Sequence, residues 1–227
     1  MRTYRAELLR SLNRATGWFL ALWLGLIMFA MLNAKPQQHE PLWGFQQAGI
    51  IVATLIMGRA ATVAAGDFST GTIRPWLISS PRRGGVCLGK LGASVTVAIA
   101  FSAIAGVFGF LMSSVLGTVP QVSEFAASAR DLVVACVALT VFGHGVGVLT
   151  RNIPIALTIT LGWILPAEHL FASNNQSDWL PGLVAQQITL GKYTGGEYAG
   201  ALVHAFLPFL IIEAVALVFF LRHDVNS

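Results

Sequence analysis

Charged residues are scarce in this chain. Only 11% of its 227 residues are charged and 55% are apolar, whereas soluble domains carry about 25% charged residues. A soluble protein of this length leaves a large part of its surface in water, and this composition offers too few polar groups to cover it. The composition therefore predicts an all-α membrane protein, with lipid as the solvent of its outer surface.

Cysteine and catalytic signatures are scarce as well. Cys87 and Cys136 are the only cysteines, and neither a disulfide nor a metal framework follows from their spacing. The sequence has no G-x-S-x-G elbow and no H-E-x-x-H pair. Glu168 and His169 are adjacent, so on a helix their side chains diverge by about 100°. We expect no catalytic residues, no metal site and no cofactor in this chain. The net charge of +4 is small, and it indicates membrane topology rather than nucleic-acid binding.

Long apolar runs dominate what is present. A bilayer core of about 30 Å needs about 20 apolar helical residues, and in lipid the backbone must satisfy its own hydrogen bonds. We expect a single domain over 1–227, with Pro154 and Pro166 bracketing its fifth span. The six predicted transmembrane helices cover residues 15–33, 47–66, 91–113, 131–150, 153–172 and 198–221.

The basic residues set an orientation. With both termini in the cytoplasm, the outer segments hold only Lys35, Arg130 and Lys192. Such a bias is the positive-inside pattern of a multi-pass protein, here assigned to the plasma (inner) membrane. The predicted inner segments hold the other basic residues outside the spans, namely Arg2, Arg5, Arg10, Arg14, Arg74, Arg82, Arg83, Lys90, Arg151 and Arg222.

Two shorter segments complete the expected fold. Residues 1–14 place leucines at helical spacing among arginines, which is typical of an interfacial helix on an anionic leaflet; a basic flank that only fixes topology is the alternative. The apolar run that follows is too long for a signal peptide. Residues 180–190 form an apolar patch too short to span, which predicts a re-entrant or interfacial helix on the outer side between spans five and six.

A polar loop between the second and third predicted spans holds most of the functional candidates. Gly71 is suited to end the second span, and Thr72 to cap a following turn. The alternative is a generic basic inner loop. The residues in question are Asp67, Gly71, Thr72, Arg74, Pro81, Arg82, Arg83 and Lys90.

The order of these residues resembles the cytoplasmic loop after the second span of ATP-binding-cassette (ABC) type 2 permeases. That resemblance implies an N-terminal elbow helix, a coupling helix between spans two and three, and an outer helix between spans five and six. It implies two copies of a separate ATPase subunit that bind ATP and Mg²⁺, and a second permease subunit, as in a homodimer. The expected function is export of an amphiphilic cargo such as an antibiotic or other drug, a peptide or a lipid.

One motif imitates a nucleotide site. Gly84 to Lys90 satisfies G-x-x-x-x-G-K, but Leu91 stands where a phosphate loop needs Ser or Thr, and a membrane span follows. We therefore expect any ATP to bind to a separate polypeptide. A second motif, Gly143-x-x-x-Gly147, permits close helix packing but is common in membrane helices.

Three polar residues fall inside the spans. Arg59, His144 and Glu213 lie about 10 to 13 Å from the inner boundary at 1.5 Å per helical residue, so they share one layer. An uncompensated charge there costs at least about 2.5 kcal/mol, and we expect an Arg59–Glu213 ion pair with His144 nearby. This layer either locks spans two, four and six together or lines a translocation path. A proton-coupled secondary transporter using Glu213 and His144 is the alternative function.

Overall fold

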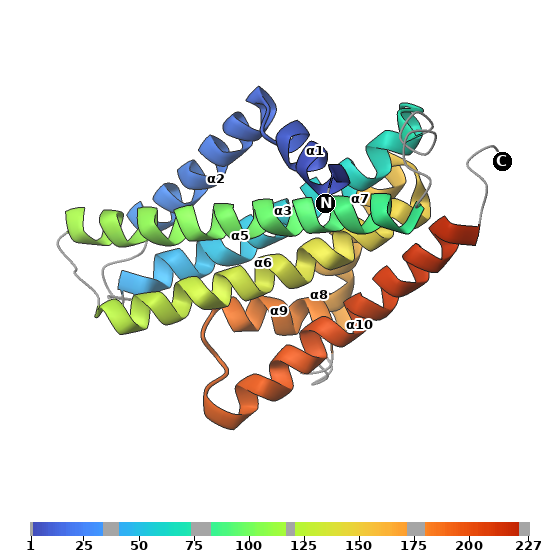
Figure 1. Ribbon diagram of the computed structural model, residues 1–227. Coiled ribbons are helices and arrows are strands. Elements are labelled where there is room, and N and C mark those ends of the chain that lie inside the picture. Colours follow the sequence, from blue (N-terminus) through green and yellow to red (C-terminus); the bar gives the residue numbers. More distant parts are fainter. Residues whose placement is uncertain (1, 34–40, 74–82, 117–120, 172–179, 223–227) are drawn as a thin grey trace.

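The computed structural model describes residues 2–33, 41–73, 83–116, 121–171 and 180–222 (Figure 1). Within these ranges all regular structure is helical. The helices are α1 (Arg2–Ser11), α2 (Arg14–Leu32), α3 (Pro41–Ser69), α5 (Arg83–Val115), α6 (Val122–Thr150), α7 (Ile153–Gly162), α8 (Glu168–Phe171), α9 (Pro181–Thr189) and α10 (Gly195–Arg222), with a π-helical turn (Trp163–Ala167) between α7 and α8.

Five helices, α2, α3, α5, α6 and α10, are long and apolar enough to cross a membrane. They correspond to five of the predicted spans and indicate a multi-pass membrane protein. The longest, α5, has 33 residues and is about 50 Å long, well beyond a hydrocarbon core of about 30 Å. α5 therefore extends past the apolar layer.

The predicted span 153–172 is not a continuous α-helix. Asn152 caps α7 by accepting a hydrogen bond from the Ile155 amide at 3.2 Å, and Pro154 lies in the first turn, where proline is tolerated. Pro166 falls within the π-helical turn. A proline has no backbone N–H and therefore interrupts the regular hydrogen-bond ladder of an α-helix. A sixth crossing is therefore not confirmed.

α6 is the central helix, and α3, α5, α7, α9 and α10 all contact it (Figure 1). Glycines allow two of these contacts. A Cβ on Gly143 would lie 2.3 Å from the Met57 carbonyl oxygen and one on Gly147 2.5 Å from that of Ala61, so both glycines admit the backbone of α3. A Cβ on Gly145 would lie 3.1 Å from the carboxylate of Glu213, which places α10 against another face. The close packing predicted from the G-x-x-x-G pattern is present.

α1 and α2 meet at a sharp bend. Asn13 forms the bend as the N-cap of α2, accepting a hydrogen bond from the Thr16 amide at 2.9 Å, and Figure 1 shows the two helices as an inverted V above α3 and α5. Tyr4 of α1 shares a 2.9 Å hydrogen bond with Thr96 of α5. A separate helix thus occupies the predicted 1–14 segment, and its place at a membrane interface stays a prediction.

The short helix α9 covers the predicted 180–190 segment and packs against α6 and α10. Its N-terminus is bound by the buried carboxylate of Glu168, which accepts hydrogen bonds from the amides of Gly182 (3.1 Å) and Leu183 (2.6 Å) and from the Trp163 indole (2.9 Å). A carboxylate at a helix N-terminus satisfies free amides and complements the helix dipole. The outer position predicted for this helix stays a prediction.

The surface carries apolar side chains where a soluble protein would carry polar ones. Trp18 and Phe29 of α2, and Leu207, Ile211 and Val215 of α10, are each more than half exposed. A soluble monomer rarely exposes contiguous apolar patches of this kind, whereas lipid is a suitable solvent for them. The exposed faces of α2 and α10 thus agree with the membrane assignment.

Candidate functional site

The predicted loop is described only at its two ends. Asp67 lies in the last turn of α3, and Gly71 and Thr72 come just after its end at Ser69. Arg83 and Lys90 lie in the first turns of α5. Arg74, Pro81 and Arg82, with the predicted coupling helix, lie outside the described residues.

Gly71 ends the helical run as predicted. α3 stops at Ser69, and Gly71 has a φ of 70°, in the left-handed region that glycine adopts without strain. The hydroxyl of Thr72 donates a hydrogen bond back to Asp67 at 2.9 Å. Thr72 thus contacts the helix it follows, and the cap that the sequence assigned to it on the next turn falls outside the described residues.

Asp67 is enclosed by cations from two other helices. Its carboxylate forms a very close ion pair with Lys90 of α5, and Arg10 of α1 lies 2.6 Å from it. Glu7 of α1 lies 3.7 Å from the Lys90 ammonium and 3.9 Å from the Arg10 guanidinium. Glu7, Arg10, Asp67 and Lys90 form a four-charge cluster with no net charge that joins α1, α3 and α5.

The cluster changes the interpretation of two loop candidates. Asp67 and Lys90 are both buried, so neither is available to a docking partner in this conformation. They hold together the two ends of the loop, because Asp67 closes α3 and Lys90 lies two turns into α5. The Gly84–Lys90 segment that imitates a nucleotide site is part of helix α5, and its lysine is the one paired with Asp67.

The intramembrane layer is arranged differently from the prediction. His144 Nδ1 lies 3.0 Å from both carboxylate oxygens of Glu213, and both residues are buried. The predicted Arg59–Glu213 pair is not formed; Arg59 donates a hydrogen bond to the Thr16 hydroxyl at 3.3 Å. The reason is that Arg59 is not on the side of α3 that faces α6. Met57 and Ala61 face α6, and Arg59, two residues from each, points about 200° around the helix from them.

Arg59 lies instead in a groove of about 410 Å³ between α2, α3 and α7. Most of its lining is apolar, and among the described residues no carboxylate lies within ion-pair distance of the guanidinium. A second groove of about 270 Å³ contains Arg59 as well and extends to Asp67 and Glu7 of the four-charge cluster. The apolar lining of the first groove includes Phe19, Leu55, Val63, Leu157 and Leu161.

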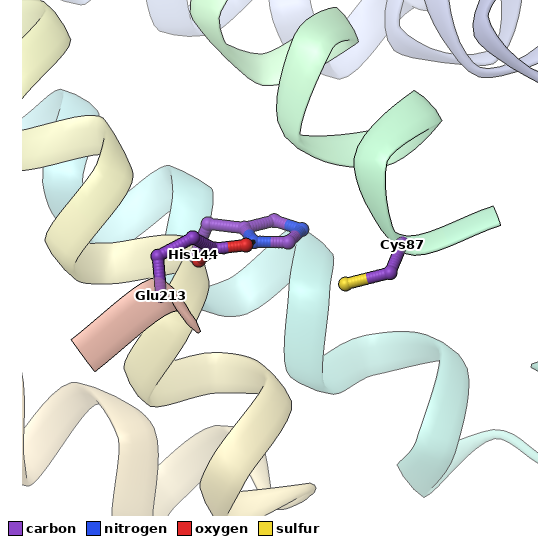
Figure 2. Close-up of side chains that lie close together, drawn as sticks. All are labelled: Cys87, His144 and Glu213. Atoms are coloured by element: carbon purple, nitrogen blue, oxygen red, sulfur yellow. Dashed lines mark hydrogen bonds and ion pairs between the residues drawn. The ribbon is translucent and has the colours of Figure 1, made fainter. Parts of the chain in front are cut away.

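The sequence analysis did not identify three residues of these two side-chain clusters. Cys87 lies beside His144 and Glu213 (Figure 2), and Glu7 and Arg10 complete the charge cluster. Glu7 and Arg10 stand three residues apart on α1, a spacing that places them on one helix face, and this was the available signal. No local pattern indicated Cys87, because its neighbours come from helices far along the chain.

The comparisons with known proteins add no family assignment. Neither a scan against protein-family models nor a search of curated proteins finds a match for this chain.

Proposed function

We propose that this chain is the permease subunit of an ABC exporter of type 2. The observation that supports this function best is the four-charge cluster. It ties both ends of the loop after the second span to α1, through Asp67 and Lys90. A loop that transmits force from a soluble ATPase needs stiff ends, and buried charge pairs define one geometry because their separation would leave uncompensated charges.

The groove at Arg59 supports a translocation path for amphiphiles. Binding sites for small molecules are mostly apolar, with a few placed polar groups, and this groove presents one cation among apolar side chains. An uncompensated cation at this depth favours an anionic group on the cargo. The proposed cargo class is therefore an amphiphile with an acidic head group.

In this proposal the working assembly contains two permease subunits, as a homodimer, and two ATPase subunits. ATP and Mg²⁺ bind to the ATPases, and the permease contributes the path and its coupling loop. The assembly lies in the plasma (inner) membrane with both termini in the cytoplasm. The basic loop residues Arg74, Arg82 and Arg83 are the proposed contacts to acidic residues of the ATPase.

Co-purification tests this function. The chain is expressed with a candidate ATPase subunit, extracted in detergent and captured, as wild type and as the triple variant Arg74→Ala, Arg82→Ala and Arg83→Ala. We expect the wild type to retain the ATPase and the loop variant to lose most of it.

A matched control distinguishes the loss of a docking contact from a general loss of positive charge. The triple variant Arg5→Ala, Arg14→Ala and Arg222→Ala removes three exposed basic residues predicted on the same side of the membrane. Retention of the ATPase by this control supports the loop as the docking site. Equal loss in both variants, or a folded wild type that binds no candidate ATPase, argues against the proposal.

The His144–Glu213 pair supports a second candidate function, a proton-coupled secondary transporter. A buried carboxylate 3.0 Å from an imidazole is a suitable proton acceptor, and such pairs mark proton relays in membrane proteins. Purified chain in liposomes distinguishes the two functions. Transport driven by a pH gradient without any ATPase, and lost in Glu213→Gln, favours this second candidate.

A further inference from the structure

Three potential metal ligands from three helices converge in the buried interior. Cys87 comes from the second turn of α5, His144 from the C-terminal third of α6 and Glu213 from α10 (Figure 2). A thiol sulfur, an imidazole nitrogen and a carboxylate oxygen from these residues all lie within 4.8 Å of one another. At most 5% of any of these residues is exposed. Neither of the proposed functions uses Cys87.

The histidine is oriented as metal-binding histidines are. Its Nδ1 faces both oxygens of Glu213 at 3.0 Å, and its Nε2 is buried without a hydrogen-bond partner among the described residues. Buried polar atoms are rarely left unpaired. A histidine that donates its Nδ1–H to a carboxylate has a free lone pair on Nε2, and this is the usual arrangement behind a metal ligand. In Figure 2 the imidazole lies between the carboxylate and Cys87.

We propose that this cluster binds a zinc ion through the Cys87 thiolate and the His144 Nε2, with Glu213 holding the imidazole in place and water filling the remaining tetrahedral positions. Zinc accepts thiolate, imidazole and carboxylate donors. Binding releases the thiol proton of Cys87, so two negative charges, on Cys87 and Glu213, balance the 2+ ion while His144 stays neutral. A cluster without net charge is compatible with burial, whereas an unbalanced charge is costly there.

The donor set favours a divalent transition-metal ion such as Zn²⁺. Ca²⁺ and Mg²⁺ prefer sites made of oxygen alone, and a monovalent ion such as Cu⁺ would leave a net negative charge beside the two anions. Zinc bonds of about 2.3 Å to sulfur and about 2.0 Å to nitrogen place those two atoms about 3.5 Å apart in a tetrahedral site. An imidazole nitrogen and the thiol sulfur lie within 4.8 Å of each other, so the two side chains are close enough for a modest rotation to bring Sγ and Nε2 to this separation.

Cobalt titration tests the proposal, because Co²⁺ replaces Zn²⁺ and gives a thiolate charge-transfer absorption band. The full chain, without a polyhistidine tag, is purified in detergent, stripped with a chelator and titrated with Co²⁺ and then with competing Zn²⁺. We expect one ion per chain, a thiolate band and displacement by zinc. Cys87→Ser should abolish the band, and Glu213→Gln should weaken binding about 10- to 100-fold, as loss of an outer-shell partner does.

The other cysteine provides the matched control. Cys136 of α6 is also a buried free thiol, so Cys136→Ser should keep the band and the affinity. A wild type without a thiolate band overturns the proposal, and so does equal binding by Cys87→Ser and the wild type. If Cys87→Ser does not fold, Cys87→Ala takes its place, and the wild-type band remains decisive without any variant. None of these measurements depends on transport or on an ATPase.

Discussion

Asp67→Asn should strongly destabilise the fold. The substitution removes one negative charge from the four-charge cluster and leaves the Lys90 side chain, which is 5% exposed, without its closest counter-charge. Arg10 is 48% exposed on its side chain and is free to turn toward water, so Lys90 is the stranded charge. Breaking a buried pair costs about 3 to 5 kcal/mol. We expect a value near the lower limit, about 3 kcal/mol, because Glu7 stays 3.7 Å from Lys90.

Unfolding in detergent, followed by tryptophan fluorescence during titration with a denaturing detergent, measures this free energy. The triple variant Glu7→Leu, Asp67→Leu and Lys90→Met removes all three buried charges of the cluster. It should recover most of the stability, because packed apolar residues are often equal to or better than buried ion pairs. Arg10→Ala should cost about 1 kcal/mol or less, since half-exposed pairs contribute little. An Asp67→Asn cost below about 1 kcal/mol, or a triple variant less stable than Asp67→Asn, would refute the reasoning.

Three further predictions concern other contacts. Gly143→Ala places a Cβ 2.3 Å from the Met57 carbonyl and should cost about 1 to 3 kcal/mol in the same unfolding assay; Gly17→Ala, which meets nothing within 4 Å, should cost nothing. Glu168→Gln should cost about 1 to 2 kcal/mol because it weakens the hydrogen bonds to the start of α9, and an unchanged midpoint would contradict that role. Arg59→Gln should weaken binding of a fluorescent fatty acid about 10-fold or more and leave binding of the matching fatty alcohol unchanged, so equal losses for both probes would argue against an anion site.

Hydropathy predicts most of the fold here because a long apolar run in lipid has few alternatives to a transmembrane helix. Five helices correspond to predicted spans. The remaining predicted span, 153–172, contains Pro166, which indicated that its helix would be interrupted. The partner of Glu168 was not predictable in the same way. Its carboxylate meets the amides of Gly182 and Leu183, and that contact depends on how the intervening chain folds back.

The sequence grouped three polar residues by their expected depth, but it did not show the direction in which they point. Counting residues placed Arg59, His144 and Glu213 in one layer, and two of the three do pair. On a soluble helix, apolar periodicity identifies the buried face. In a membrane helix apolar residues occupy every face, so the sequence could not show that Arg59 points away from α6. The glycines of α6 define that face in the structure, since Gly143 and Gly147 admit only the opposite side of α3.

The first turns of α5 connect the four-charge cluster to the group formed by Cys87, His144 and Glu213. Lys90 binds α5 to α1 and α3 through the four-charge cluster, and Cys87, one helical turn earlier, brings it to His144 and Glu213 on α6 and α10. Residues three apart on a helix lie on neighbouring positions of its surface, so one turn of α5 contacts both sides of the bundle. A displacement of the loop before Arg83 must therefore move both attachments together or break one of them. Separating the charge pairs would leave uncompensated buried charges, which is strongly unfavourable. Bending at the first turns of α5 would separate one of these attachments, so the geometry favours movement of α5 together with the helices to which it is attached.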